Sequence, residues 1–134
     1  ESTPVGNAGT TEADLASYTL PAGTFAGGNK RLRIYAAWDV ATGNTHASEL
    51  KVYFGSSLLF ETGFVVLMEA GRGPAGQWLE LLATGQQAQF LLGGAWGLFA
   101  MTENAAAPID IRVTARGEAA NDITLKLFQV ELNG

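Results

Sequence analysis

The stretch Tyr18–Val40, YTLPAGTFAGGNKRLRIYAAWDV, contains the pattern on which most of the chain is built. Apolar residues occupy every second position from Leu32 to Val40, which is the period of a strand with one face in a core. The segment before it contains Pro21 and several glycines, which are the residues of turns. The stretch therefore predicts two strands joined by a turn.

The same period of two recurs at Leu50–Phe54 and at Ile109–Ala115, and turn residues separate such runs at short intervals. Strands of ordinary length fit between these turns, about eight to ten of them. The pattern predicts an all-β fold, an antiparallel two-sheet sandwich of jelly-roll type, over residues 15–134. Residues 1–14 are polar and without apolar period, so they predict an extended N-terminal arm.

The last run changes phase. Ile123, Leu125 and Leu127 share one strand face, whereas Phe128 and the alternate residues after it share the other. Because a slip of one residue turns every side chain over, a β-bulge near Leu127–Phe128 would place both halves on the same core. The alternative is that both faces of the sheet are covered at this end.

Two apolar runs, Phe64–Gly71 and Phe90–Phe99, do not alternate, which is typical of strands covered on both faces. One sandwich core covers a single face, so subunit contact is expected on the other. The expected interface residues are Phe64, Val66, Met68, Phe90, Leu92, Trp96 and Phe99. The uncharged stretch 81–102 contains Gln and Gly, and it predicts two strands joined at 84–87 in place of a membrane helix.

Length and charge limit the class of protein. The chain has 134 residues, enough for one domain, and a net charge of −5 with eight Lys and Arg. A net negative charge with so few basic residues predicts no binding to nucleic acid and no attraction to anionic membranes. Only 16% of residues are charged, against about 25% in an average protein, which suggests a surface covered by a partner.

The residues that carry chemistry form no recognisable motif. His46 is the only His, no GxSxG motif accompanies Ser17 or Ser48, and no Cys is present. The sequence therefore predicts no catalytic, cofactor-binding or metal-binding residues and no enzyme. Trp38 is in phase with the core, whereas Tyr35 and Tyr53 fall on the opposite face, where a sugar-stacking platform is the alternative to packing. Glu118–Asp122 predicts a turn, with a weak calcium loop as the alternative.

Four segments carry a resemblance to a known family: YTLPAGTF (18–25), LRIYA (32–36), ELKVYFG (49–55) and PIDIRVTARGEAANDITLKLFQVEL (108–132). In this order the chain resembles the jelly-roll domain of tailed-bacteriophage virion proteins. These are capsid decoration (cement) proteins, and also tail-fibre and spike modules. The resemblance implies an all-β homotrimer without enzymatic residues.

The expectation that follows is a non-enzymatic virion protein on the capsid surface, most simply a decoration protein that stabilises the head. Its partners would be two further copies and the major capsid protein, with Thr3, Pro4 and Val5 as a tether. Deletion of residues 1–14 is then expected to leave the fold intact and to weaken attachment. The alternative is a host-receptor or glycan-binding module of a tail fibre or spike.

Overall fold

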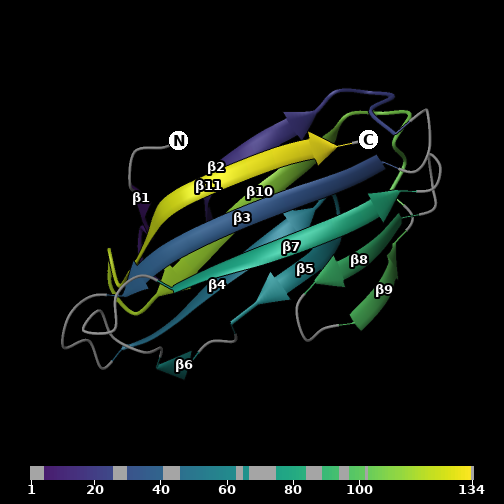
Figure 1. Ribbon diagram of the computed structural model, residues 1–134. Coiled ribbons are helices and arrows are strands. Elements are labelled where there is room, and N and C mark those ends of the chain that lie inside the picture. Colours follow the sequence, from purple (N-terminus) through teal and green to yellow (C-terminus); the bar gives the residue numbers. More distant parts are fainter. Residues whose placement is uncertain are drawn as a thin grey trace.

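Two antiparallel sheets pack face to face in the computed structural model, which describes residues 5–25, 30–40, 46–62, 65–66, 75–83, 89–93, 97–101 and 103–133 (Figure 1). The first sheet has the order β1 (Val5–Gly6), β11 (Ile123–Asn133), β3 (Lys30–Val40), β7 (Ala75–Ala83), β8 (Gln89–Gly93) and β9 (Gly97–Met101). The second sheet has the order β2 (Ala13–Leu20), β10 (Ile109–Gly117), β4 (Ala47–Phe54) and β5 (Ser57–Glu61), with β6 (Val65–Val66) paired to β4. Among the described residues no helix is long and apolar enough to cross a membrane.

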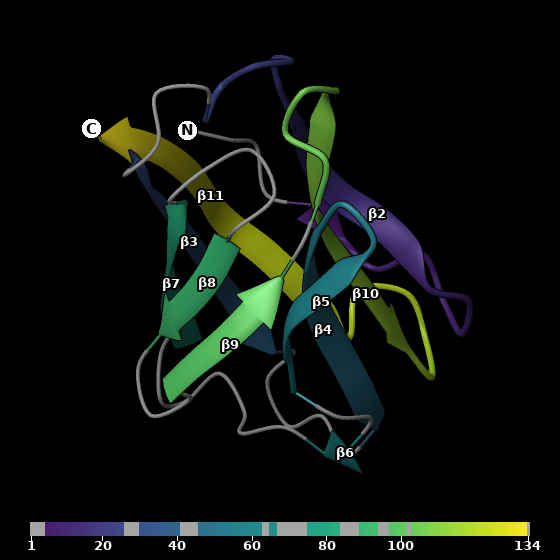
Figure 2. The ribbon, with the colours of Figure 1, turned by 90° about the vertical axis from the view of Figure 1, so that its right-hand side faces the viewer.

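The strand order is that of a jelly roll, as predicted. Successive strands β1, β2, β3 and β4 alternate between the sheets, and the late strands β10 and β11 insert between the early ones. Each sheet therefore joins the beginning of the chain to its end. Figure 2 shows the two layers edge on, with β3, β7 and β11 in one and β2, β4, β5 and β10 in the other.

The core lies between the sheets and contains the residues that the period of two predicted. Leu32, Ile34 and Leu50 are fully buried, and Trp38 is 6% exposed. The Trp38 ring lies 5.7 Å from that of Phe60, a partner from the opposite sheet. Trp38 is therefore a core residue, as its phase in the sequence predicted.

The phase break in β11 is a β-bulge, also as predicted. The register with β3 shifts between Leu125 and Leu127, so Lys126 has no partner residue. Phe128 and Val130 consequently pack against the core on the same side as Ile123 and Leu125. The alternative of two covered faces is not needed to explain the sequence here.

The uncharged stretch 81–102 forms strands, as predicted, but three described strands take part in place of the two expected, because β7 pairs with β8 and β8 with β9. The run Phe64–Gly71 is described only at β6, which pairs with Ala47 and Ser48. The expected interface positions Phe64, Met68 and Trp96 lie outside the described residues. Val66, Phe90, Leu92 and Phe99 lie on described strands, but their side chains are outside what the structure describes. The proposed subunit interface stays a prediction.

The N-terminal arm is part of the sandwich, which corrects the expected boundary at residue 14. Val5 and Gly6 pair with Leu125 and Thr124 of β11, and Ala13 and Asp14 already belong to β2. Of the expected tether residues, Thr3 and Pro4 lie outside the described part of the chain, and Val5 is a strand residue of β1. The polar composition of 5–14 gave a wrong boundary because these residues bind through backbone groups and through the buried side-chain amide of Asn7, which leave no apolar period.

Candidate functional site

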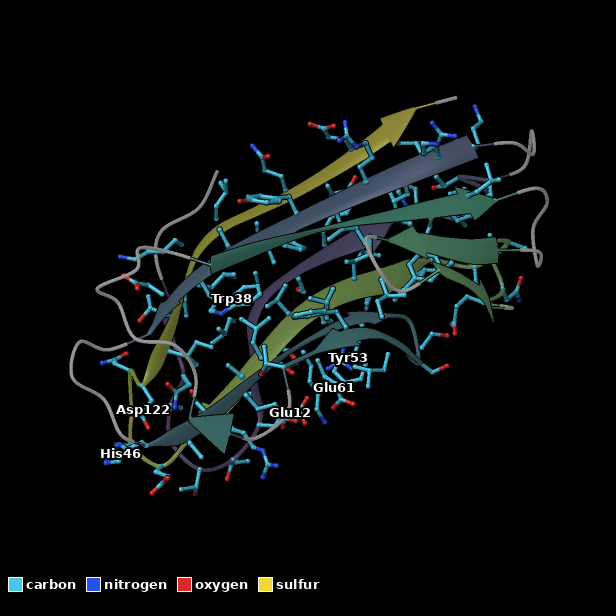
Figure 3. The ribbon with its side chains drawn as sticks, turned by 60° about the horizontal axis from the view of Figure 1, so that its bottom comes forward. Glu12, Trp38, His46, Tyr53, Glu61 and Asp122 are labelled. Atoms are coloured by element: carbon cyan, nitrogen blue, oxygen red, sulfur yellow. The ribbon has the colours of Figure 1, made fainter. Side chains whose placement is uncertain are left out.

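The outer face of the second sheet carries a connected set of charged and polar side chains. Alternation along β4 and β10 directs every second side chain away from the core, and the strand pairing then places these side chains next to one another. We call the set the outer-face network; its members are Glu12, Asp14, Glu49, Lys51, Tyr53, Arg112, Thr114 and Arg116. Figure 3 shows Glu12, Tyr53 and Glu61 on this side of the sandwich.

Glu12 lies at the centre of the network. Its Oε2 accepts hydrogen bonds from the hydroxyls of Thr114, at 2.6 Å, and Tyr53, at 3.0 Å. The ammonium of Lys51 lies 3.8 Å from its Oε1. The hydrogen bond from Thr114 is the largest influence on the pKa of Glu12, and together with the Tyr53 hydroxyl and Lys51 it outweighs burial and lowers that pKa. Glu12 thus joins three strands as a charged acceptor.

The Tyr53 ring has one face covered. The Arg112 guanidinium lies 4.6 Å from the ring centre, in the geometry of a cation–π contact. Arg112 also donates to Asp14 at 3.1 Å, which holds the guanidinium in place. Burial, followed by the hydrogen bond to Glu12, raises the pKa of Tyr53. The face that Arg112 covers is therefore closed to a stacking sugar ring.

Glu49 is a buried carboxylate at the edge of the same network. Its side chain is only 7% exposed, and its Oε1 accepts a hydrogen bond from the Arg116 Nε at 3.0 Å. Lys51 lies 3.9 Å from the same oxygen. Because a buried charge without a partner is costly, Arg116 and Lys51 are what allow Glu49 to remain at this position. The network therefore stabilises the sheet.

His46 and Asp122 form a second polar cluster at one end of the sandwich (Figure 3). The Nδ1 of His46 lies 3.0 Å from Asp122 Oδ1, across 76 residues of sequence. Asp122 Oδ2 accepts hydrogen bonds from the amides of Glu118 and Ala119, both at 2.9 Å, and Glu118 Oε2 accepts from the Ala47 amide. The cluster fastens the turn 118–122 to the start of β4. That turn was predicted, whereas its pairing with His46 was not.

The charges of this pair are mutually stabilised. The hydrogen bond and then the charge of Asp122 raise the pKa of His46 above 6.5. Burial opposes ionisation of Asp122, but the bonds from His46, Ala119 and Glu118 outweigh it and lower the pKa of Asp122. The ion pair is therefore complete between the lowered pKa of Asp122 and the raised pKa of His46.

We expect stability to fall as pH rises through the raised pKa of His46. The pKa of His46 is higher in the folded protein than in the unfolded chain. The contribution of the ion pair to stability is therefore fully present below pH 6.5 and is lost as pH rises above the pKa of the folded state. His46→Asn retains a donor but cannot ionise, so its urea midpoint should lie further below wild type at pH 5.5 than at pH 8.5. An NMR titration of this single His checks the pKa directly, and an unshifted pKa would contradict the expectation.

Asn7 closes the same end of the sandwich from the N-terminal side. Its side chain is 1% exposed and makes three hydrogen bonds to backbone groups. Oδ1 accepts from the Ile123 amide at 3.0 Å, and Nδ2 donates to the carbonyls of Ala119, at 2.8 Å, and Gly9, at 3.1 Å. A side-chain amide supplies both the acceptor and the donors that this site requires.

Gly117 gives Asn7 and Asp122 the room they need. A Cβ at this position would lie 2.8 Å from Asp122 Oδ2, closer than a real Cβ approaches, and in a tight contact of 3.0 Å with Asn7 Nδ2. Any larger residue would push apart the two side chains that fasten the ends of β1, β10 and β11. Glycine is therefore required here by close approach.

The remaining candidates from the sequence stay apart or are engaged in the fold. Tyr35 is half-buried on the outer face of β3, and in the described residues no three His, Cys, Asp or Glu side chains are grouped to hold a metal. An open hollow of about 310 Å³ lies where Gly55, Glu103, Asp110 and Arg112 meet. Glu103 accepts hydrogen bonds from the hydroxyls of Ser56 and Ser57, so it fastens the β4–β5 turn.

Comparison with known proteins adds a weak structural similarity. No family model matches the chain, and no curated protein matches it. Among solved structures, it is similar to the CBM2 module of the evolved Dit protein of Lactobacillus casei BL23 phage J-1, with a TM-score of 0.34 and 14% identity. The match covers 87% of this chain and 66% of that one. A similarity of this size assigns neither ligand nor location to this chain.

Proposed function

We propose that this chain is a non-enzymatic structural protein of a tailed-bacteriophage particle. In this proposal three copies bind the outer capsid surface as a decoration protein and stabilise the head, with the major capsid protein as partner. The tail-fibre or spike module that binds a host glycan is the competing class.

One observation carries the proposal: the segments that resemble phage virion jelly rolls form the adjacent strands of a jelly roll. Tyr18–Leu20 lies in β2, 32–36 in β3, 49–54 in β4, and 109–132 spans β10 and β11. Direct neighbours within the sheets are β2 with β10, β10 with β4, and β3 with β11. Further support comes from the polar clusters, since Glu12, Glu49 and Asp122 bind groups of the sandwich itself.

Binding to purified shells tests the proposal. Shells assembled from the major capsid protein encoded in the same genome are mixed with this chain, and bound protein is measured after sedimentation. We expect saturable binding at a whole-number ratio of three per site, and light scattering extrapolated to low concentration should give three times the 14.1 kDa of one chain. Protein that stays in the supernatant, or that antibody labelling locates on the tail, would contradict the proposal.

A competing glycan function has its own readout. Under that reading the chain binds a host polysaccharide in a glycan array, and Tyr35→Ala abolishes the signal while the mass in solution is unchanged. Under the decoration reading no glycan signal depends on Tyr35, so the two assays separate the classes.

A further inference from the structure

The large apolar side chains that are exposed among the described residues lie on one side of the sandwich. They are Val5 on β1, Tyr18 on β2 and Leu132 on β11, which are 39%, 46% and 45% exposed. Strand β2 ends the second sheet, and β11 ends the first wherever β1 does not cover it. Figure 1 shows β2 and β11 along the same upper margin of the molecule, and the two strands contact each other.

Within the described part of the chain, β11 has an open strand edge from Leu127 onward. From Leu127 to Asn133 it pairs with β3 on one side, whereas β1 pairs only with Thr124 and Leu125 on the other. Beyond Leu127 no described strand takes up the free backbone groups. The stretch contains no Pro and no bulge, and Glu131 is its one charged residue, so few of the features that normally keep an edge from pairing are present. Such an edge fits an added antiparallel strand.

The sequence of this edge is complementary to itself. Val130 is the midpoint of residues 127–133, and the pattern Phe128–Gln129–Val130–Glu131–Leu132 reads apolar, polar, apolar, polar, apolar in both directions. Antiparallel pairing about Val130 would place Val130 opposite its copy and Phe128 opposite Leu132. Gln129 would lie opposite Glu131, so no two carboxylates meet.

We propose that the free edge of β11 pairs with the same edge of a second copy, around a two-fold axis at Val130. The contact continues the first sheet from one molecule into the next and covers Leu132. It also brings together the β2 edges, where Tyr18 is exposed. A two-fold contact is isologous and closes with two copies, so in a trimeric decoration protein it joins one trimer to its neighbour. It is a property of the chain in solution and does not depend on capsid binding.

Charge variants at Gln129 test the register. Gln129 is exposed and faces away from the core, so its replacement leaves the sandwich intact. In the Gln129→Lys variant, a positive charge on each copy would lie opposite Glu131 of the other copy, so the pair would gain two attractive contacts. We expect its dissociation constant to fall about tenfold. Gln129→Glu, the matched control of opposite sign, should raise it about tenfold. Sedimentation velocity over a concentration series measures both, and equal constants for the two variants would overturn the proposal.

Single cysteines test the axis, since the native chain has none. Under mild copper–phenanthroline oxidation, Val130→Cys should give a disulfide-linked pair on a non-reducing gel, because two copies of this position face each other at the axis. Leu132→Cys is the control on the same face of the same strand. Its two copies would lie four residues apart along the strand, about 13 Å, beyond the reach of about 7 Å for a disulfide.

Two results would overturn the proposal. Equal cross-linking of both cysteines would show random collision, because position 132 is the more exposed of the two. A Val130→Cys protein that keeps its free thiol in solution would mean that the edge remains open or receives a strand from a capsid protein. Loss of shell binding with the pairing intact would instead contradict only the proposed function.

Discussion

Removing residues 1–14 should abolish cooperative folding. The truncation deletes β1 and the first two residues of β2, and it removes Asn7 and Glu12 with all their hydrogen bonds. The amide of Ile123 and the carbonyl of Ala119 would lose their buried partner. Together these losses exceed about 5 kcal/mol, which is the whole stability of many small domains. We expect the circular dichroism signal of this truncated chain to show no sigmoidal transition as urea is added.

The control for this truncation removes residues 1–4 and leaves β1, Asn7 and β2 in the chain. Its urea transition provides the reference midpoint and slope. If the longer truncation unfolds with the same midpoint, residues 5–14 are a dispensable arm, as the composition suggested, and the structural account of the N-terminus is wrong.

Replacing Asn7 by alanine should lower the free energy of unfolding by about 3 kcal/mol. The substitution removes three buried hydrogen bonds and leaves the Ile123 amide and the Ala119 carbonyl without their side-chain partner. Each buried polar group left unsatisfied costs about 1–3 kcal/mol, partly relieved where water enters. The measurement is urea unfolding at pH 7 with a shared slope for wild type and variant.

Asn104→Ala is the matched control. Asn104 is exposed, and its Oδ1 accepts one hydrogen bond, from the Ala106 amide in a turn. The same chemical change should therefore cost less than about 1 kcal/mol. Equal losses for the two variants would mean that Asn7 contributes no more than an ordinary surface turn residue.

The alternation of apolar residues predicted the fold because a strand in a sandwich has one buried face. Ile34, Trp38 and Val52 are buried as their phase required, and the slip at Leu127–Phe128 marked a bulge. An apolar period of two residues indicates which face of the strand a side chain occupies. A break in that period indicates where the backbone must adjust. The predicted number of strands was slightly low, because the described chain also contains the two-residue strands β1 and β6.

The polar clusters could not be predicted in the same way. Glu12 meets Tyr53 and Thr114 only because β2, β10 and β4 are neighbours, and the Thr114 contact spans 102 residues. His46 reaches Asp122 across 76 residues through the ends of β4 and β10. A side chain's face follows from its position in the strand, but its neighbour follows from the order of strands in the sheet, which the period does not contain.

By itself, then, the sequence determined the sandwich, its core face and the bulge in β11, since each follows from burial of every second side chain. Only the tertiary structure decided that the polar segment 5–14 contains strand β1 and the buried Asn7, and that no described strand pairs with the outer edge of β11 beyond Leu125. Both features depend on which backbone groups form hydrogen bonds with partners distant in the sequence. Such hydrogen bonds produce no periodic pattern of residue types.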